Sequence, residues 1–362
     1  MLEKEVQDRI RLSMIKEPET ITISSRFKRG EARKPSLSVL NDAPPSKYPR
    51  KPTNALDRLE GKADYVRVGV EHFKQHDIFQ LSDTDRDSIV EYMNKVLDGP
   101  DAEFNREIWD EIGKEGADLA ERLTPQLKNE PMFNLCVAIN ESRVNMLASA
   151  NRRLDHAIEL FAKNDYPTRL PVYAMRLQNE IQSEYRPQTK YVDRVAAMKY
   201  WITSDFRARG IEERFAMDDV ETFYRIAFQN RDLAALEEFI YCVEMNNTLP
   251  KWFQSMALAK YYYQLGYYYR GTGFANSVSE QGWAKLEENA KLAHKYFQEA
   301  LEINPNYPES ATGLMDVSRL GHSDKSEEFW FNKAIEHEVD YMAAYQLRLF
   351  GLMPRWEVRW RR

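Results

Sequence analysis

The fold of this chain is decided by residues 252–270, WFQSMALAKYYYQLGYYYR, together with residues 290–305, AKLAHKYFQEALEINP. The first stretch surrounds a glycine with large residues at helical spacing, namely Tyr262, Leu265, Gly266 and Tyr269. The second stretch combines small residues with an aromatic residue and a closing proline, namely Ala293, Phe297, Ala300 and Pro305. Because Gly266 and Ala293 allow two helices to approach closely, the pattern predicts antiparallel packing of helix 252–270 against helix 283–303.

A recurrence of 34 residues continues this pattern toward the C-terminus. The residues in corresponding positions are Phe297 and Phe331, Ala300 and Ala334, Leu301 and Ile335, and Tyr307 and Tyr341. This interval is the period of the tetratricopeptide repeat, a helix-turn-helix unit. Because one unit cannot bury its apolar face alone, such units stack into a curved array. The sequence therefore predicts an all-α fold, a helical-hairpin array with tetratricopeptide-like C-terminal repeats.

An insert of 15 residues separates the two helices of the first repeat. Tyr269 and Ala293 are 24 residues apart, where the repeat pattern has about nine. The residues of the insert and its end that stand out are Gly271, Gly273, Asn276 and Trp283. Glycines here allow the chain to leave the first helix with positive φ angles. A phosphate loop is not favoured, because the turn follows a helix and lacks the Lys-Ser/Thr ending.

The region from Trp252 to Trp356 resembles the C-terminal part of an uncharacterised bacterial family of tetratricopeptide-like domains. The shared features are an R-G-T-G-aromatic-A-N insert at residues 270–276, the pair Gly282-Trp283, and a terminal Pro-basic-Trp motif at residues 354–356. That motif usually continues with Gly-Gly, whereas Glu357 and Val358 follow here. The resemblance implies a bacterial, tetratricopeptide-like C-terminal third and brings no established activity.

The composition is that of a soluble folded protein. The 362 residues are 43% hydrophobic and 30% charged, with a formal net charge of -6. No apolar run approaches the roughly 18 residues that span a bilayer. The N-terminus, MLEKEVQDRIRLSM, carries charges where a signal peptide needs an apolar core. We therefore expect a cytoplasmic protein without a membrane segment.

Helical periodicity recurs along the chain, interrupted at prolines, and one of the longest predicted helices covers residues 132–162. The prediction divides the chain into three parts. Residues 1–60 form a flexible, basic, proline-rich arm; residues 61–250 form a divergent helical body; residues 251–362 form the tetratricopeptide-like repeats. The alternative for the arm is an ordered segment that binds a partner or an acidic face of its own body.

The sequence offers no convincing metal or cofactor site. His72 and His76 lie on one helical face, but Phe73 stands where a zinc-protease helix carries its glutamate. An acidic run after Ser82 resembles a calcium loop without its glycine, and capping of the following helix explains it better. The only cysteines, Cys136 and Cys242, have apolar neighbours and are expected to be buried thiols.

A stripe on helix 252–270 is the candidate binding surface. In the repeat register the exposed face of that helix carries Lys260, Tyr263, Tyr267 and Arg270. Two tyrosines with two cations could bind a protein or peptide, and an acidic segment would suit them. The alternative is that the insert folds back over this stripe. Tyr262 and Tyr269 are predicted to be buried on the opposite face.

The sequence favours an interaction module that binds a partner segment in a concave helical groove. Nucleic acid is not favoured, because the basic and aromatic residues of the C-terminus form one short tail. Two alternatives belong to other classes of protein. One is an enzyme with an active-site loop at residues 270–283; the other is a structural subunit of a larger assembly. The sequence shows no recognisable catalytic motif, so the prediction is that the protein is not an enzyme.

Overall fold

The computed structural model describes residues 55–75, 81–99, 105–181, 191–204, 206–208, 210–323 and 325–352. Every regular element in these ranges is a helix, which confirms the all-α prediction for this part of the chain. The arm up to residue 54, His76 and the terminal motif at 354–356 lie outside the described residues. The first described helix begins at Ala55, within the segment that the sequence assigned to the arm.

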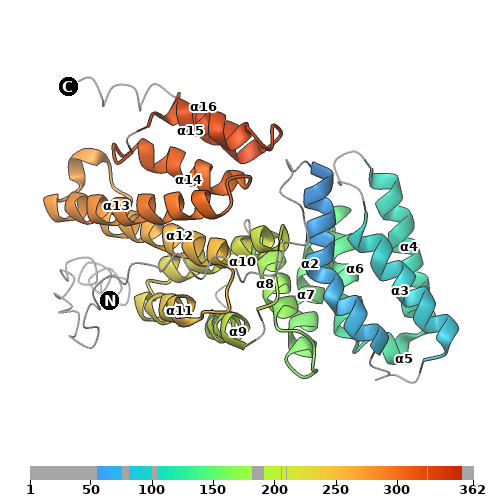
Figure 1. The fold of residues 1–362 in the computed structure, drawn as a ribbon. Coiled ribbons are helices and arrows are strands. Elements are labelled where there is room, and N and C mark those ends of the chain that lie inside the picture. The colour runs from blue at the N-terminus through green and yellow to red at the C-terminus, as the bar shows by residue number, and fades with distance from the viewer. Residues whose placement is uncertain are drawn as a thin grey trace, which may run out of the picture. The chain divides into compact units, whose positions relative to one another are not determined.

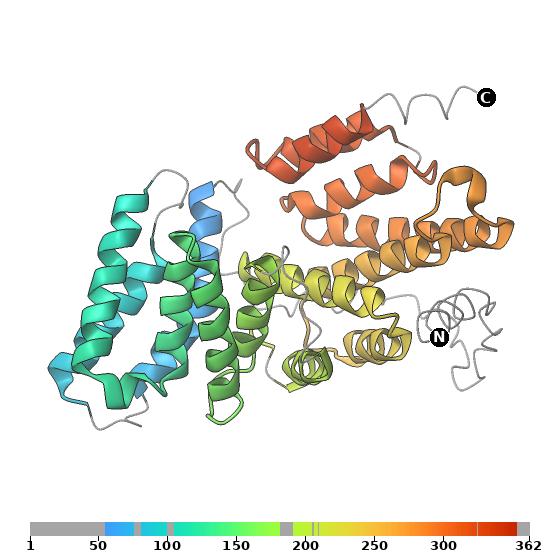
Figure 2. The same cartoon turned by 180° about the vertical axis from the view of Figure 1, so that it is seen from behind.

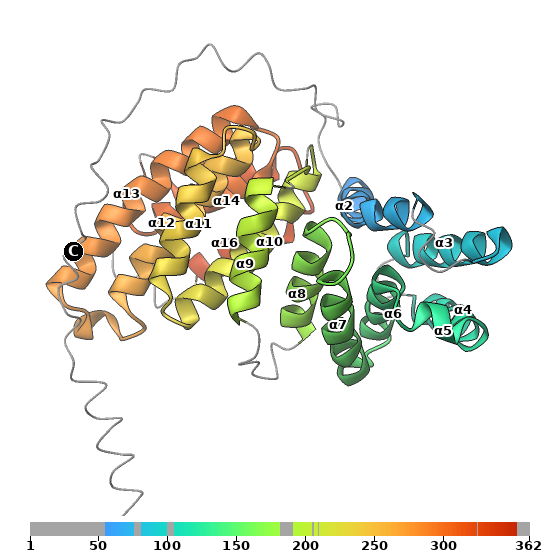
Figure 3. The ribbon, with the colours of Figure 1, turned by 90° about the horizontal axis from the view of Figure 1, so that it is seen from below.

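The first group of helices packs around the aromatic residues Tyr65, Tyr92, Trp109 and Phe133. Its members are α2 (Ala55–Gln75), α3 (Asp83–Leu97), α4 (Arg106–Arg122), α5 (Thr124–Leu127), α6 (Pro131–Arg143) and α7 (Leu147–Phe161). Helix α6 contacts α2, α3, α4 and α7, so it is central to the group (Figure 1). Figure 3 shows α6, α7 and α8 side by side.

Helix starts follow the capping residues of the sequence. Ser82 accepts a hydrogen bond from the amide of Asp85, so the acidic run after it begins helix α3, as the capping interpretation predicted. Serine at positions 279 and 326 caps two later helices in the same way. These side chains accept hydrogen bonds from amides that have no partner within the helix.

Glu130 is a fully buried cap at the start of α6. Its carboxylate accepts hydrogen bonds from the amide of Phe133 and from the hydroxyl of Tyr166. Burial raises the pKa of Glu130 to about 7, although these two hydrogen bonds oppose the shift. The ring of His72 lies against Tyr166, with 4.2 Å between ring centroids.

The prediction of a single helix over residues 132–162 is wrong. The chain forms α6 and α7 instead, separated by Asn145 with a φ angle of 65°. Asparagine tolerates this left-handed conformation better than most residues with a side chain. Neither glycine nor proline marks the break, which is why the periodic pattern ran through it.

In the second group of helices, every other helix contacts two later helices of the chain. Its members are α8 (Arg169–Ile181), α9 (Tyr191–Ser204), α10 (Glu212–Gln229), α11 (Leu233–Met245), α12 (Lys251–Arg270), α13 (Glu280–Ile303), α14 (Pro308–Ser318), α15 (Glu327–Ile335) and α16 (Met342–Gly351). Each even-numbered helix from α8 to α14 packs against the odd-numbered helix that follows it. It also contacts the next even-numbered helix (Figure 2). We refer to α8, α10, α12, α14 and α16 as the helix row.

One buried core includes residues from Tyr65 of α2 to Trp330 of α15. Because α10 packs on α12, helices on both sides of residue 250 share this core. The predicted division at residues 60 and 250 stays a prediction. Cys136 is buried as expected, whereas Cys242, which lies near Lys199, is only partly buried.

Candidate functional site

Helices α12 and α13 pack directly against each other in antiparallel sense, as the sequence predicted. The ring of Tyr262 on α12 is parallel to that of Tyr296 on α13, with centroids 5.7 Å apart. Toward the other end of the pair, a Cβ atom on Gly266 would lie 3.2 Å from side-chain atoms of Leu286 and Asn289. The absence of a side chain at Gly266 therefore allows the close approach on which the register was based.

The buried tyrosine of α12 is not one of those that the sequence predicted to be buried. Tyr261 is the buried tyrosine, where it contacts Phe228 and Tyr224 of α10. Tyr262 is only partly buried, and Tyr269 is exposed, so both expectations were wrong. The cause is that α12 packs against α10 as well as α13, which turns Tyr261 into the core.

Of the four predicted stripe residues, the two tyrosines lie together, while each of the two cations binds a different partner. The rings of Tyr263 and Tyr267 lie together, with centroids 5.1 Å apart, and both side chains are accessible to water. The ammonium of Lys260 pairs with the carboxylate of Glu221 on α10 at 2.9 Å. Burial lowers the pKa of Lys260, but the charge and the hydrogen bond of Glu221, together with the charges of Asp316 and Glu309, raise it overall.

Arg270 belongs to the insert. Its Nη1 atom donates hydrogen bonds to the carbonyl oxygens of Gly271 at 2.9 Å and Gly273 at 3.2 Å. Its guanidinium carbon lies 5.2 Å from the ring centroid of Trp283. Gly271 has a φ angle of 77°, as expected for a glycine that ends a helix. The insert therefore folds back over the Arg270 end of the stripe.

The remainder of the insert is exposed. Asn276 lies in a short 3-10 turn at Ala275–Ser277 and is exposed. Phe274 is 87% exposed, and its carbonyl accepts hydrogen bonds from both the amide and the hydroxyl of Ser277. These local bonds fix the backbone of the insert without covering its aromatic side chain.

Ion pairs connect α8 with α10 and α10 with α12, further pairs lie near α14, and the sequence analysis missed all of them. Arg176 on α8 pairs with Asp218 at 3.1 Å and with Asp219 at 3.0 Å, both on α10. Glu221 on the same helix pairs with Lys260 of α12. The remaining pairs are Arg214 with Glu309 and Glu338, Asp316 with Arg319, and Arg319 with Glu327. No local motif indicates the pairs that join different helices, whereas Asp316 and Arg319 lie three residues apart in the sequence.

Asp218 is accessible and desolvated at the same time. Its side chain is 58% exposed to water. Burial by surrounding protein nevertheless raises its pKa to about 7, despite the positive charge of Arg176. Burial also raises the pKa of Asp316, which is partly exposed on α14.

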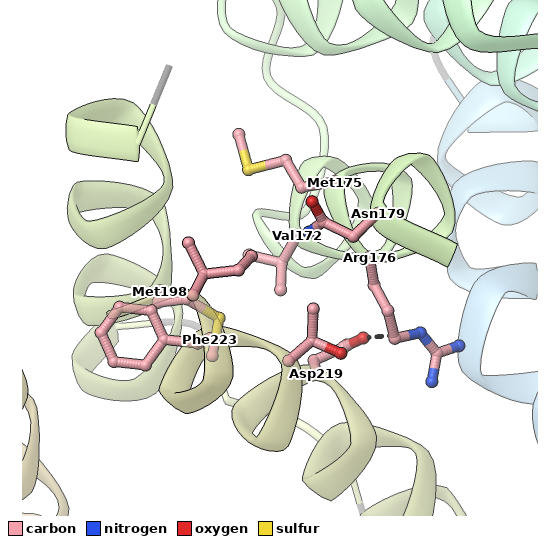
Figure 4. A pocket seen from close by; sticks show the side chains of 9 residues that line it. Val172, Met175, Arg176, Asn179, Met198, Asp219 and Phe223 are labelled. Carbon is pink, nitrogen blue, oxygen red and sulfur yellow. Dashed lines mark ion pairs between the residues drawn. The ribbon is translucent and has the colours of Figure 1, made fainter. Parts of the chain in front are cut away.

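A small pocket lies beside the ion pair of Arg176 with Asp219 (Figure 4). It holds about 320 Å³ of space, part of it open to solvent, and is lined by Val172, Met175, Arg176, Asn179, Met198, Asp219, Thr222, Phe223 and Ile226. The buried carboxylate of Asp219 accepts a hydrogen bond from the Tyr65 hydroxyl of α2 at 2.6 Å. The pocket lies among α8, α9 and α10, and no residue of the 270–283 insert lines it.

Within the described ranges, no group of three or more histidine, cysteine or acidic side chains could hold a metal ion. None of the helices described combines the length and apolar character that crossing a membrane requires. Searches with protein-family models, among curated proteins and among solved structures found no match to this chain. The resemblance to the bacterial tetratricopeptide-like family stays a prediction.

Proposed function

We propose that this chain is an interaction protein whose helix row binds an extended segment of a partner protein. The observation that carries the proposal is a set of accessible polar side chains on three consecutive helices of the row. These are Asp218 and Glu221 on α10, Tyr263 and Tyr267 on α12, and Asp316 on α14. Burial by surrounding protein shifts the pKa of Asp218, Tyr263, Tyr267 and Asp316 upward while water still reaches them.

The repeat interpretation supports the same function. The alternating contacts along the series of helices from α8 to α16 agree with stacked helical hairpins. The 34-residue recurrence covers the last of these hairpins. In stacked hairpin arrays, the first helices of successive units line a common surface. The helix row would be that surface, with Tyr263 and Tyr267 at its centre.

A second candidate is a structural subunit of a larger assembly. The observation that favours it is a set of exposed apolar side chains around α16, namely Val339, Met342, Leu349 and Leu352. Contiguous exposed apolar surface marks protein contacts when it is large enough. Measurement of molecular mass in solution by light scattering tests this candidate. A defined oligomer that Leu349→Glu dissociates would support it; a monomer would contradict assembly with further copies of this chain.

The main proposal is tested by quantitative affinity capture from native cells. The test variant is Tyr263→Ala with Tyr267→Ala. The matched control is Tyr200→Ala with Tyr241→Ala, which removes two exposed tyrosines from α9 and α11, outside the row. Contact aromatics of this type often contribute about 2 kcal/mol or more to binding.

The expected result is that the control captures the same proteins as the unaltered chain, while the test variant loses them. Circular dichroism should give the same helical content for all three proteins. Equal capture by the test variant and the control would place the binding surface outside the helix row.

A further inference from the structure

Three ion pairs along the helix row have a carboxylate that is more exposed than its cation, whereas Asp219 and Glu338 are fully buried beside Arg176 and Arg214. The side chain of Arg176 is 5% exposed, whereas that of its partner Asp218 is 58% exposed. The side chain of Lys260 is 22% exposed and that of its partner Glu221 is 37% exposed. The side chain of Arg319 is 14% exposed and that of its partner Asp316 is 27% exposed. At these three pairs, a molecule that approaches the row meets the carboxylate oxygens before it meets the cations.

The cations that suggested an acidic partner already have partners of their own. Lys260 pairs with Glu221, and Arg270 donates to two carbonyl oxygens of the insert. Binding of an acidic segment would have to break these contacts or leave carboxylates facing one another. Like charges brought together in this way destabilise a complex.

The outward carboxylates also lie close enough to repel one another. The charge of Glu221 adds to burial in raising the pKa of Asp218, and it acts in the same direction on Asp316. Lys260 offsets part of this repulsion at Glu221 and Asp316, and a further cation from a partner would relieve the rest. Tyr263 and Tyr267 add aromatic rings to the same surface, and ring faces attract ammonium and guanidinium groups.

We propose that the partner segment held by the helix row is basic. Its lysine or arginine side chains would pair with Asp218, Glu221 and Asp316 and lie against the rings of Tyr263 and Tyr267. This inference rests on the proposed function and adds the chemistry of the partner. Three outward carboxylates on consecutive helices suit an extended segment better than a single cation.

The inference is tested with three synthetic peptides of equal length. One repeats lysine and serine, the second contains acetyl-lysine in place of lysine, and the third contains glutamate. Titration calorimetry measures the dissociation constant of each peptide with the full chain. We expect the lysine peptide to bind, and the acetylated and glutamate peptides to bind far more weakly.

Two carboxylate variants locate the binding. The test variant is Asp218→Asn with Asp316→Asn, in which Arg176 keeps Asp219 and Arg319 keeps Glu327 as partners. We expect it to weaken binding of the lysine peptide by about tenfold, which corresponds to about 1.4 kcal/mol for the loss of two exposed ion pairs.

The matched control for this test is Glu287→Gln with Glu288→Gln on α13. It removes the same charge from exposed side chains outside the row. The control is necessary because the whole chain carries a formal net charge of -6 and attracts polycations everywhere. The control should bind the lysine peptide as tightly as the unaltered chain does.

The outcomes separate this inference from the proposed function. Tighter binding of the glutamate peptide, lost in Tyr263→Ala with Tyr267→Ala, would overturn the basic partner and leave the helix row as the binding surface. Equal weakening in both carboxylate variants, or no binding of any peptide, would overturn the inference. The capture experiment with the tyrosine variants decides the proposed function independently.

Discussion

Arg270 lies over the ring of Trp283, with the guanidinium carbon 5.2 Å from the ring centroid, while its Nη1 atom donates to the backbone of the insert. The two residues connect the end of α12 to the start of α13. Because Arg270 is occupied in this way, we assign it to the conformation of the insert. The binding surface then depends on Tyr263, Tyr267 and the carboxylates of the helix row.

Arg270→Ala should loosen the insert and leave the helices intact. Two hydrogen bonds and one cation–π contact are lost at a partly exposed site, so we expect a cost of about 1 kcal/mol. Hydrogen exchange measures the effect at the Ser277 amide, which bonds to the Phe274 carbonyl. Lys285→Ala on α13 is the control and should leave that exchange rate unchanged. An equally slow exchange in Arg270→Ala would contradict the assignment.

Arg214→Met should be strongly destabilising. The Arg214 guanidinium is buried, pairs with Glu309 and Glu338, and lies over the rings of Tyr307 and Tyr341. Removal of one partner from a buried ion pair typically costs about 3–5 kcal/mol. Urea unfolding monitored by circular dichroism gives the change in the free energy of unfolding.

A second substitution provides the control for Arg214→Met. Glu338→Gln removes the fully buried carboxylate that would be left behind, so the double variant should recover part of the lost stability. A cost of less than about 1 kcal/mol for Arg214→Met alone would show that the ion pair contributes little to the fold.

Glu130→Gln should change how stability depends on pH. The folded-state pKa of Glu130 is raised to about 7, while that of an unfolded glutamate is about 4.3. Between these values the folded state binds more protons than the unfolded state, so the stability contributed by protonated Glu130 is present at low pH and lost as pH rises toward 7. The difference amounts to about 4 kcal/mol.

Unfolding free energies of the two proteins measured from pH 5 to pH 8 test this account. The stability of Glu130→Gln relative to the unaltered chain should increase over that range, because glutamine has no proton to lose. Subtraction of the two profiles removes the contributions of Asp218 and Asp219, which both proteins share. Parallel profiles would mean that Glu130 does not titrate in this range.

Gly266→Val should separate α12 from α13. A Cβ atom at this position already lies 3.2 Å from Leu286 and Asn289, and the branched side chain adds two methyl groups beyond it. Overpacking of this kind costs about 1–3 kcal/mol. A melting temperature equal to that of the unaltered chain would contradict the close approach.

The sequence predicted those parts of the structure that depend on local signals. Ser82 caps α3, Gly271 ends α12, and Gly266 marks the close approach to α13. Each of these effects acts within one turn of helix or across one pair of neighbouring helices. The break at Asn145 escaped prediction because asparagine adopts a positive φ angle too rarely to serve as a reliable signal.

The candidate site was predicted only in part, because its electrostatics depend on distant pairs. From the sequence alone, Lys260 and Arg270 were predicted to be cations available to a partner on one stripe of α12. Glu221 neutralises the first from another helix, and the backbone of the insert binds the second. The spacing of residues along one helix determines which of them share a face, but it carries no information about what the next helix places opposite them.

The most direct test of the helix row as a binding surface is cross-linking in living cells. The photoreactive amino acid p-benzoyl-phenylalanine replaces Tyr267 on the row in one protein and Tyr241 on α11 in another. Both side chains are exposed, so both probes reach solvent. The account predicts a discrete cross-linked partner from position 267 and none from position 241. Cross-linking at 241 alone, or equal cross-linking at both positions, would contradict it.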